Sequence, residues 1–146
     1  MKKLKIAIVL ALLPLQFVAA KSPQKNDDGV FTPTHAIDTY IDAMVRGRLN
    51  GFDAVIDGSA KFTMLISKNR LNSFDKKQML TFMNVIKDTE LDCTVNTGII
   101  QNTPDMVVAK VDMKFATFTR SNYVSMANTH SGWKIINVYS VFNQVK

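Results

Sequence analysis

The sequence predicts an α+β fold, with helices gathered in the first half of the chain and a run of antiparallel strands in the second. Apolar residues recur at three- and four-residue spacing over residues 32–56 and 74–86, which is typical of helices that bury one face. Residues 91–142 then read as four consecutive strands separated by polar turns. Helices followed by a meander of strands indicate an antiparallel sheet rather than βαβ repeats.

The last strand, residues 132–142, limits the possible architectures further because it carries apolar residues on both of its faces. A strand with one face in water alternates apolar and polar residues. The sheet is therefore expected to be covered on both sides, by helices, a partner subunit or a ligand.

The first residues have the pattern of a cleavable signal peptide over residues 1–20. A short basic stretch precedes an almost wholly apolar run from Ile6 to Val18, and two alanines follow, with Lys21 as the expected mature N-terminus. The apolar run is shorter than the roughly 20 residues that a spanning helix needs, so no stable membrane anchor is expected. We expect export, to the periplasm or beyond, and a polar lead-in over residues 21–31.

The composition of the mature chain excludes some classes of partner. Cleavage would remove three of the 18 basic residues and none of the 12 acidic ones, which lowers the net charge from +6 to +3. The remaining basic residues are scattered, so no nucleic-acid partner is predicted. Cys93 is the one cysteine and cannot form an internal disulfide. It alternates with Leu91 and Val95, so we interpret it as a small buried apolar residue.

The helices have recognisable ends. Thr32 and Pro33 are typical of a helix start, and Gly47 is typical of a helix end. The residues expected on the buried face of this first helix are Ala36, Ile37, Tyr40, Ile41, Met44 and Val45. A short second helix is expected after Asn50, and Ser73 is expected to cap a third that runs to Ile86.

The strands are bounded by turn residues. Residues 61–66 predict a first strand, with a turn at 67–70, and later turns are expected at 101–105, 120–122 and 130–132. On the strand that follows Asp105, apolar residues alternate from Val107 to Phe115 and should face the core.

Three features together resemble the NTF2-like superfamily. They are Arg46-Gly47-Arg48 after the opening helix, a third helix bounded by polar residues, and the closing sequence Gly-Trp-Lys-Ile-Ile at 132–136. The resemblance spans residues 32–142 and is greatest to small secreted bacterial members of the SnoaL-like and lumazine-binding kind. It implies a single domain over residues 32–146, shaped as a cone in which a curved antiparallel sheet wraps around the N-terminal helix.

The resemblance also implies a homodimer through the outer face of the sheet, for which the sequence offers Lys134, Ile136, Val138 and Phe142. The superfamily includes isomerases, dehydratases, cyclases and hydrolases as well as binding proteins, so the fold does not select among these functions.

The sequence pattern places the residues that could act as a general acid or base, or bind a metal, on polar sides of their elements or in isolation. Asp38, Asp42, Asp92 and Asp112 each fall on the polar side of their element. His35 and His130 stand alone, without the paired spacing of a metal site. Arg120 is expected in a turn and hence in solvent. We therefore predict no catalytic residue, no metal and no cofactor.

The candidate ligand-binding residues come from the closing strand and the first helix. Trp133, Asn137 and Tyr139 alternate onto one face, and Tyr40 and Met44 could close over it. The same aromatic residues could equally be ordinary core or dimer-interface residues. The favoured hypothesis is an exported, non-catalytic module that binds a small apolar or aromatic molecule.

Two alternatives stay open. One is an isomerase-, dehydratase- or cyclase-type enzyme acting on a small apolar substrate, in which Asn137 and Tyr139 polarise a carbonyl and Asp42 or His35 is the base. The other is a structural or interaction protein whose cone is filled by its own side chains.

Overall fold

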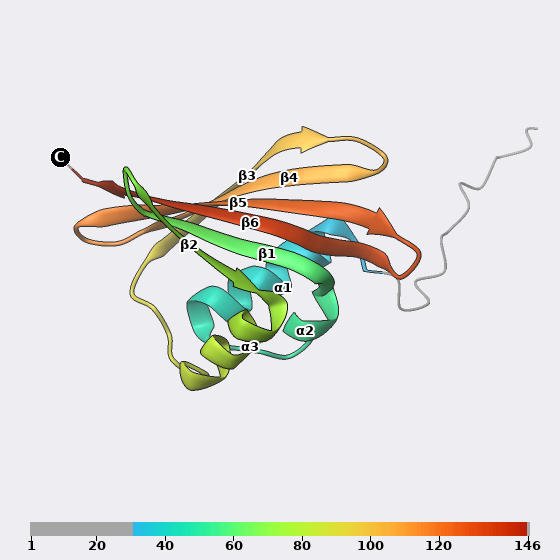
Figure 1. The fold of residues 1–146 in the computed structure, drawn as a ribbon, viewed down its shortest axis with the longest axis horizontal. Helices are drawn as coiled ribbons and strands as arrows, with labels where there is room; N and C mark the ends of the chain where they lie inside the picture. The colour runs from blue at the N-terminus through green and yellow to red at the C-terminus, as the bar shows by residue number, and fades with distance from the viewer. Residues whose placement is uncertain (1–30, 146) are drawn as a thin grey trace, which may run out of the picture.

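The computed structural model describes residues 31–145 and has the predicted α+β architecture, in which three helices lie against one face of a six-stranded sheet (Figure 1). The signal peptide and all but the last residue of the lead-in lie outside the described residues. The elements in chain order are α1 (Pro33–Arg46), α2 (Phe52–Val55), β1 (Ile56–Ser67), β2 (Arg70–Asp75), α3 (Lys76–Val85), β3 (Thr94–Asn102), β4 (Met106–Lys114), β5 (Phe118–Thr129) and β6 (Gly132–Gln144). Within residues 31–145, no helix has the length and apolar content to cross a membrane.

Helix α1 begins and ends as predicted. The Thr32 hydroxyl accepts a hydrogen bond from the His35 N–H at 3.1 Å, and Pro33 occupies the first turn, where no N–H partner is needed. Gly47 ends the helix with φ of +63°, and a Cβ there would lie 2.7 Å from the backbone nitrogens of Asp88 and Thr89. Glycine is therefore required at this position by both conformation and space.

The start of α3 differs from the prediction. Ser73 lies in strand β2, where its hydroxyl is 3.2 Å from that of Thr63 on β1. Asp75 is the N-cap instead: its carboxylate accepts from the Gln78 N–H at 2.8 Å, and the Gln78 side chain accepts from the Asp75 N–H at 2.9 Å. This reciprocal capping box satisfies two backbone donors at once and fixes the helix two residues later than expected.

The sheet is mixed rather than wholly antiparallel. Its strand order is β2-β1-β6-β5-β4-β3, and β1 pairs in parallel with β6, while every other pair is antiparallel. The first and last long strands thus lie side by side near the middle of the sheet (Figure 1). This pairing joins segments far apart in the chain, so no local sequence pattern could indicate it.

The β4–β5 turn also differs from the prediction. It lies at residues 116–117, and the Phe115 N–H donates to the Phe118 carbonyl at 2.9 Å across it. The rings of Phe115 and Phe118 stack with centroids 4.5 Å apart. Arg120, expected in a turn, is consequently inside β5.

Strand β6 contains a bulge that reverses which face its side chains occupy. Met126 of β5 pairs with Ile135, but Ser125 pairs with Asn137, so Ile136 has no partner of its own. Trp133 and Ile135 lie on the core side before the bulge. After it, Val138, Ser140 and Phe142 share the face of the buried β5 residues Asn122 and Val124. Val138 and Phe142 are therefore not on the outer face, where they had been expected.

The core lies between the helices and this inner face of the sheet. The alternation predicted for β4 is confirmed, because its residues from Val107 to Met113 that face the helices are buried. Helix α1 contributes Tyr40 and Met44 to the same core. Cys93 is half-buried against it, and burial raises the pKa of its thiol.

Candidate ligand-binding site

The structure does not bring the five predicted site residues together. Tyr40 and Met44 are buried in the core on α1. Trp133 is half-buried near the start of β6, where its backbone N–H donates to the Phe31 carbonyl at 2.8 Å. Asn137 and Tyr139 follow the bulge and lie on the opposite, outer face of the sheet. The predicted alternation of Trp133, Asn137 and Tyr139 onto one face is therefore interrupted by the bulge, and Tyr40 and Met44 cannot close over all three.

The outer face places Tyr139 beside Tyr123 of β5 and Thr63 of β1, and Asn137 beside Ser125. All five are half-buried, and no helix among residues 31–145 covers this face (Figure 1).

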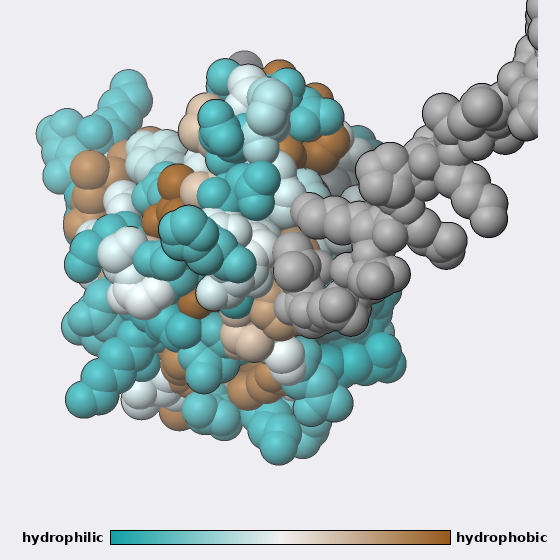
Figure 2. Space-filling view, turned by 90° about the vertical axis from the view of Figure 1, so that its right-hand side faces the viewer, coloured by the Kyte–Doolittle hydropathy of each residue, from teal (hydrophilic) through white to brown (hydrophobic). Residues whose placement is uncertain are grey.

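The end of the molecule that carries the β5–β6 hairpin is mostly hydrophilic, with hydrophobic side chains scattered in small groups (Figure 2).

A polar network lies on the inner face, where the sequence predicted only apolar contacts. The Arg120 Nε donates to the Asn122 side-chain oxygen at 2.9 Å, and the Arg120 Nη2 donates to the Ser140 hydroxyl at 3.4 Å. Ser140 itself donates to the same Asn122 oxygen at 2.7 Å, and the Asn122 amide donates to the Val111 carbonyl at 3.2 Å. We call Arg120, Asn122 and Ser140 the inner polar network.

The inner polar network was missed because Arg120, Ser121 and Asn122 resemble a turn. The signal that could have found it is the alternation that continues from Asn122 through Val124 and Met126, all of which are buried. Extended by one step, that alternation places Arg120 on the inner face.

Tyr40 brings a second polar group to this face. Its side chain is wholly buried, and its hydroxyl has no hydrogen-bond partner among the described residues. Burial raises the pKa of Tyr40, and the nearby positive charge of Arg120 lowers it by less. The phenol therefore stays protonated at neutral pH and offers a hydrogen-bond donor and acceptor.

Ionisable groups of the kind that abstract protons lie elsewhere. No carboxylate or imidazole is buried among residues 31–145. His35 is exposed, and Asp42 forms an exposed ion pair with Arg46. On the outer face, burial opposes the ionisation of Asp112, but hydrogen bonds from Ser121 at 2.6 Å and Lys110 outweigh it and lower the pKa of Asp112.

Metal ligands are likewise dispersed. Across the described part of the chain, no three His, Cys, Asp or Glu residues come close enough to hold an ion.

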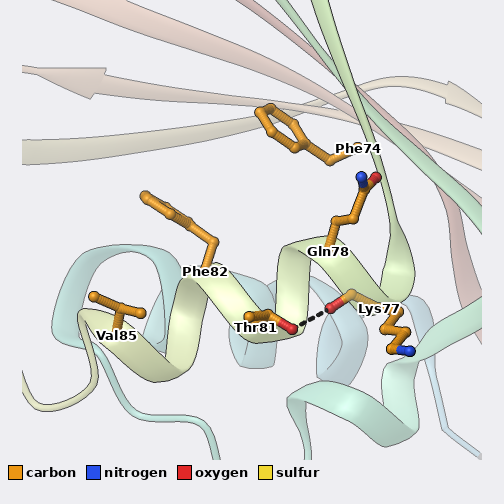
Figure 3. Close-up of a pocket in the computed structure, with 6 residues that line it drawn as sticks. All are labelled: Phe74, Lys77, Gln78, Thr81, Phe82 and Val85. Carbon is orange, nitrogen blue, oxygen red and sulfur yellow. Dashed lines mark hydrogen bonds between the residues drawn. The ribbon is translucent and has the colours of Figure 1, made fainter.

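A small apolar cavity lies between α3 and the sheet. It has a volume of about 40 Å³ and is lined by Met64, Phe74, Met79 and Phe82. Phe74 and Phe82 also line an open groove along α3 of about 530 Å³, together with Lys77, Gln78, Thr81 and Val85 (Figure 3). Figure 3 shows Phe82 projecting from α3 towards the strands, and its side chain lines both the cavity and the groove.

The cavity and the inner polar network are neighbours across the sheet. Met64 of β1 pairs with Ser140 of β6, which pairs with Asn122 of β5. Adjacent strands are about 4.8 Å apart, so an apolar wall and a cationic group lie within the length of one small molecule. This combination of apolar space with a few convergent polar groups is typical of ligand sites.

Comparison with solved structures shows which fold this is. An NTF2-like protein of unknown function from Silicibacter pomeroyi aligns with a TM-score of 0.60 at 17% sequence identity, over 77% of this chain and 92% of its own. An NTF2-like protein of unknown function from Methylobacillus flagellatus aligns at 0.55 and 16%, over 84% and 96%. A cystatin-like fold protein from Burkholderia xenovorans aligns at 0.61 and 10%, over 77% and 90%.

No protein-family model matches the sequence, and no curated protein does. At these identities the likeness concerns the fold alone: the chain has the NTF2-like fold, and its function has to be argued from its own residues.

Proposed function

We propose that this domain with the NTF2-like fold is an exported, non-catalytic module that holds a small apolar or aromatic molecule between α3 and the inner face of the sheet. The observation that carries the proposal is the cavity behind Phe82. Its four lining residues, Met64, Phe74, Met79 and Phe82, expose only apolar surface to it. Such a space favours a ligand that water solvates poorly.

The size of the cavity requires Phe82 to move when a ligand enters. A cavity of about 150 Å³ accommodates benzene, whereas this one measures about 40 Å³. The Phe82 side chain is 52% exposed, so it is held by few contacts and can rotate at low cost. Rotation away from Met64 would join the cavity to the groove along α3 and make room for a ring.

The ionisable groups support binding rather than acid–base catalysis. The inner face presents a protonated phenol and a guanidinium, and a guanidinium does not give up its proton in proteins. Asp42 and His35, which an enzyme of this kind would need as the base, point to solvent. A general base must reach its substrate within hydrogen-bond distance.

The ligand itself is the first test. Native mass spectrometry of the protein purified from its own host should detect a bound small molecule, and N-terminal sequencing of the exported form should begin at Lys21. An empty protein that also shows no thermal shift with indole, toluene and similar apolar probes would refute the binding proposal.

A matched pair of variants locates the site. Met64→Trp fills the cavity and should abolish the thermal shift caused by the apolar probe. Ile66→Trp, two residues along the same strand and 44% exposed, should leave it unchanged. Equal probe binding by both variants would place the ligand elsewhere.

We also propose that the outer face forms a homodimer. Tyr123, Tyr139 and Val141 are half-buried there, and no helix among residues 31–145 covers this face (Figure 1). Sedimentation should report a dimer, and Tyr139→Glu should convert it to a monomer because an unpaired charge buried in an interface is costly. A wild-type monomer at micromolar concentration would refute this.

A further inference from the structure

Arg120 has more hydrogen-bond donors than the protein uses. A guanidinium carries five N–H donors, and Arg120 directs two of them at Asn122 and Ser140. No Asp or Glu among the described residues lies within 4.0 Å of it. The guanidinium also lies over the Phe142 ring, with the ring centroid 5.8 Å from the guanidinium carbon. Three N–H groups and a full positive charge are thus left for water or a ligand.

The two hydrogen bonds that Arg120 makes fix the orientation of its planar guanidinium group. Asn122 is wholly buried and is itself held by Val111 and Ser140, so it cannot turn away. A side chain positioned by packed, hydrogen-bonded neighbours loses less entropy when it binds a ligand. An arginine placed on an inner face for solubility alone would need no such support.

Tyr40 supplies a second observation on the same side of the sheet. Its hydroxyl is buried without a partner in residues 31–145, and the positive charge of Arg120 lowers the pKa of the phenol by less than burial raises it. Buried hydroxyl groups nearly always have a partner in native proteins. An acceptor atom bound between Arg120 and Tyr40 would satisfy both groups at once.

We propose that this inner face binds a monocarboxylate with an apolar body: the carboxylate sits on the Arg120 fork with one oxygen accepting from the Tyr40 hydroxyl, and the body extends past Ser140 towards Met64 and Phe82. This inference rests on the proposed function and names the chemical class of its ligand. The planar guanidinium fork matches a carboxylate in a bidentate manner. Arg120 is the one cation of the inner polar network, so a monoanion leaves the pair neutral, whereas a phosphate dianion would leave a buried negative charge.

The decisive experiment compares two probes of nearly the same shape, one a carboxylate and the other its neutral amide. Isothermal titration of the full mature chain with 3-phenylpropanoate and with 3-phenylpropanamide should show the carboxylate binding about tenfold to a hundredfold tighter, the range expected for charge-assisted hydrogen bonds. Inorganic phosphate should not compete. Equal affinity for the two probes, or displacement of the carboxylate by phosphate, would overturn the proposal.

Variants test whether Arg120 and Tyr40 are the residues that make the protein prefer the carboxylate probe to the amide. Arg120→Met should remove the preference for the carboxylate and leave amide binding unchanged. Arg48→Met, an exposed surface arginine with the same change of charge, should retain the preference. Tyr40→Phe should weaken carboxylate binding severalfold while leaving the fold intact. A full carboxylate preference in Arg120→Met would overturn the proposal even if binding itself persists.

Failure of this inference can be told apart from failure of the proposed function. If the protein from its host carries a neutral molecule, or binds both probes equally, the cavity binds ligands and the carboxylate site is wrong. If it is empty and binds neither probe, both proposals are wrong. If Arg120→Met does not fold, Arg120→Lys provides the second test: it keeps the charge but loses the fork, and should retain only part of the preference.

Discussion

Replacing Tyr40 by phenylalanine should stabilise the ligand-free protein, although the residue is wholly buried. The hydroxyl has no partner in the described chain, and a buried unsatisfied polar group costs about 1–3 kcal/mol. Removing it leaves a space on the order of 10–15 Å³. At about 24 cal/mol per Å³, that space costs about 0.3 kcal/mol. The free energy of unfolding should therefore rise by about 0.7–2.7 kcal/mol, which is the difference between these two contributions.

The assay is urea unfolding of the ligand-free protein at fixed concentration, followed by fluorescence and circular dichroism. We expect a higher midpoint with an unchanged m-value, and a melting temperature raised by about 4 °C per kcal/mol. Tyr139→Phe is the matched control, because Tyr139 is only half-buried on the outer face and the loss of its hydroxyl should change stability by less than about 0.5 kcal/mol.

A decrease in stability in Tyr40→Phe would refute the reasoning, because it would mean that the hydroxyl has a partner in the folded protein. The carboxylate probe gives a further check. When it is bound, the hydroxyl gains a partner, so the stability advantage of Tyr40→Phe should shrink or reverse as the probe concentration rises.

Three further predictions concern the scaffold. Gly47→Ala should destabilise the protein by more than about 1 kcal/mol in urea unfolding, because φ is +63° and the added Cβ would lie 2.7 Å from two backbone nitrogens; an effect no larger than that of an exposed substitution would contradict this. Asp75→Ala should cost about 1 kcal/mol by removing the cap of α3, and Asp75→Asn should recover most of it. Hydrogen bonds from the side chain and then the backbone of Ser59 lower the pKa of Asp57 below 3.8, so its contribution to stability is present above that value and is lost as the pH falls through the native pKa. Asp57→Asn should accordingly flatten the acid limb of the stability curve, and an unchanged limb would count against it.

Local chemistry allowed much of the fold to be predicted. The hydroxyl of Thr32, the missing N–H of Pro33 and the left-handed conformation of Gly47 all act within a few residues, so the sequence shows them directly. The start of α3 was predictable in the same way and was misjudged. Gln78 follows Asp75 at the spacing of a capping box, whereas nothing at that spacing supports Ser73.

The candidate site was predicted less well than the fold, because the prediction assumed an unbroken strand register in β6 and a different position for the β4–β5 turn. A bulge at Ile136 has no glycine or proline to announce it, yet it moves Asn137 and Tyr139 to the outer face and Ser140 to the inner one. The true β4–β5 turn at 116–117 also lacks these residues, so Arg120 was assigned to solvent. A register error of one residue thus leaves the predicted fold correct but assigns the side chains of the site to the wrong face.

The position of β6 has a consequence for how the chain folds. The strand made last lies between β1, made first, and β5, so a nascent chain that ends before Gly132 can form only two separate pieces of the structure. Ile56 of β1 pairs with Ile135 of β6, so forming this contact closes a loop of nearly eighty residues and costs the corresponding chain entropy. Contacts so distant in sequence slow folding. The β1 amides that bond to β6 should therefore acquire protection from hydrogen exchange together with β6, and later than those that bond to β2.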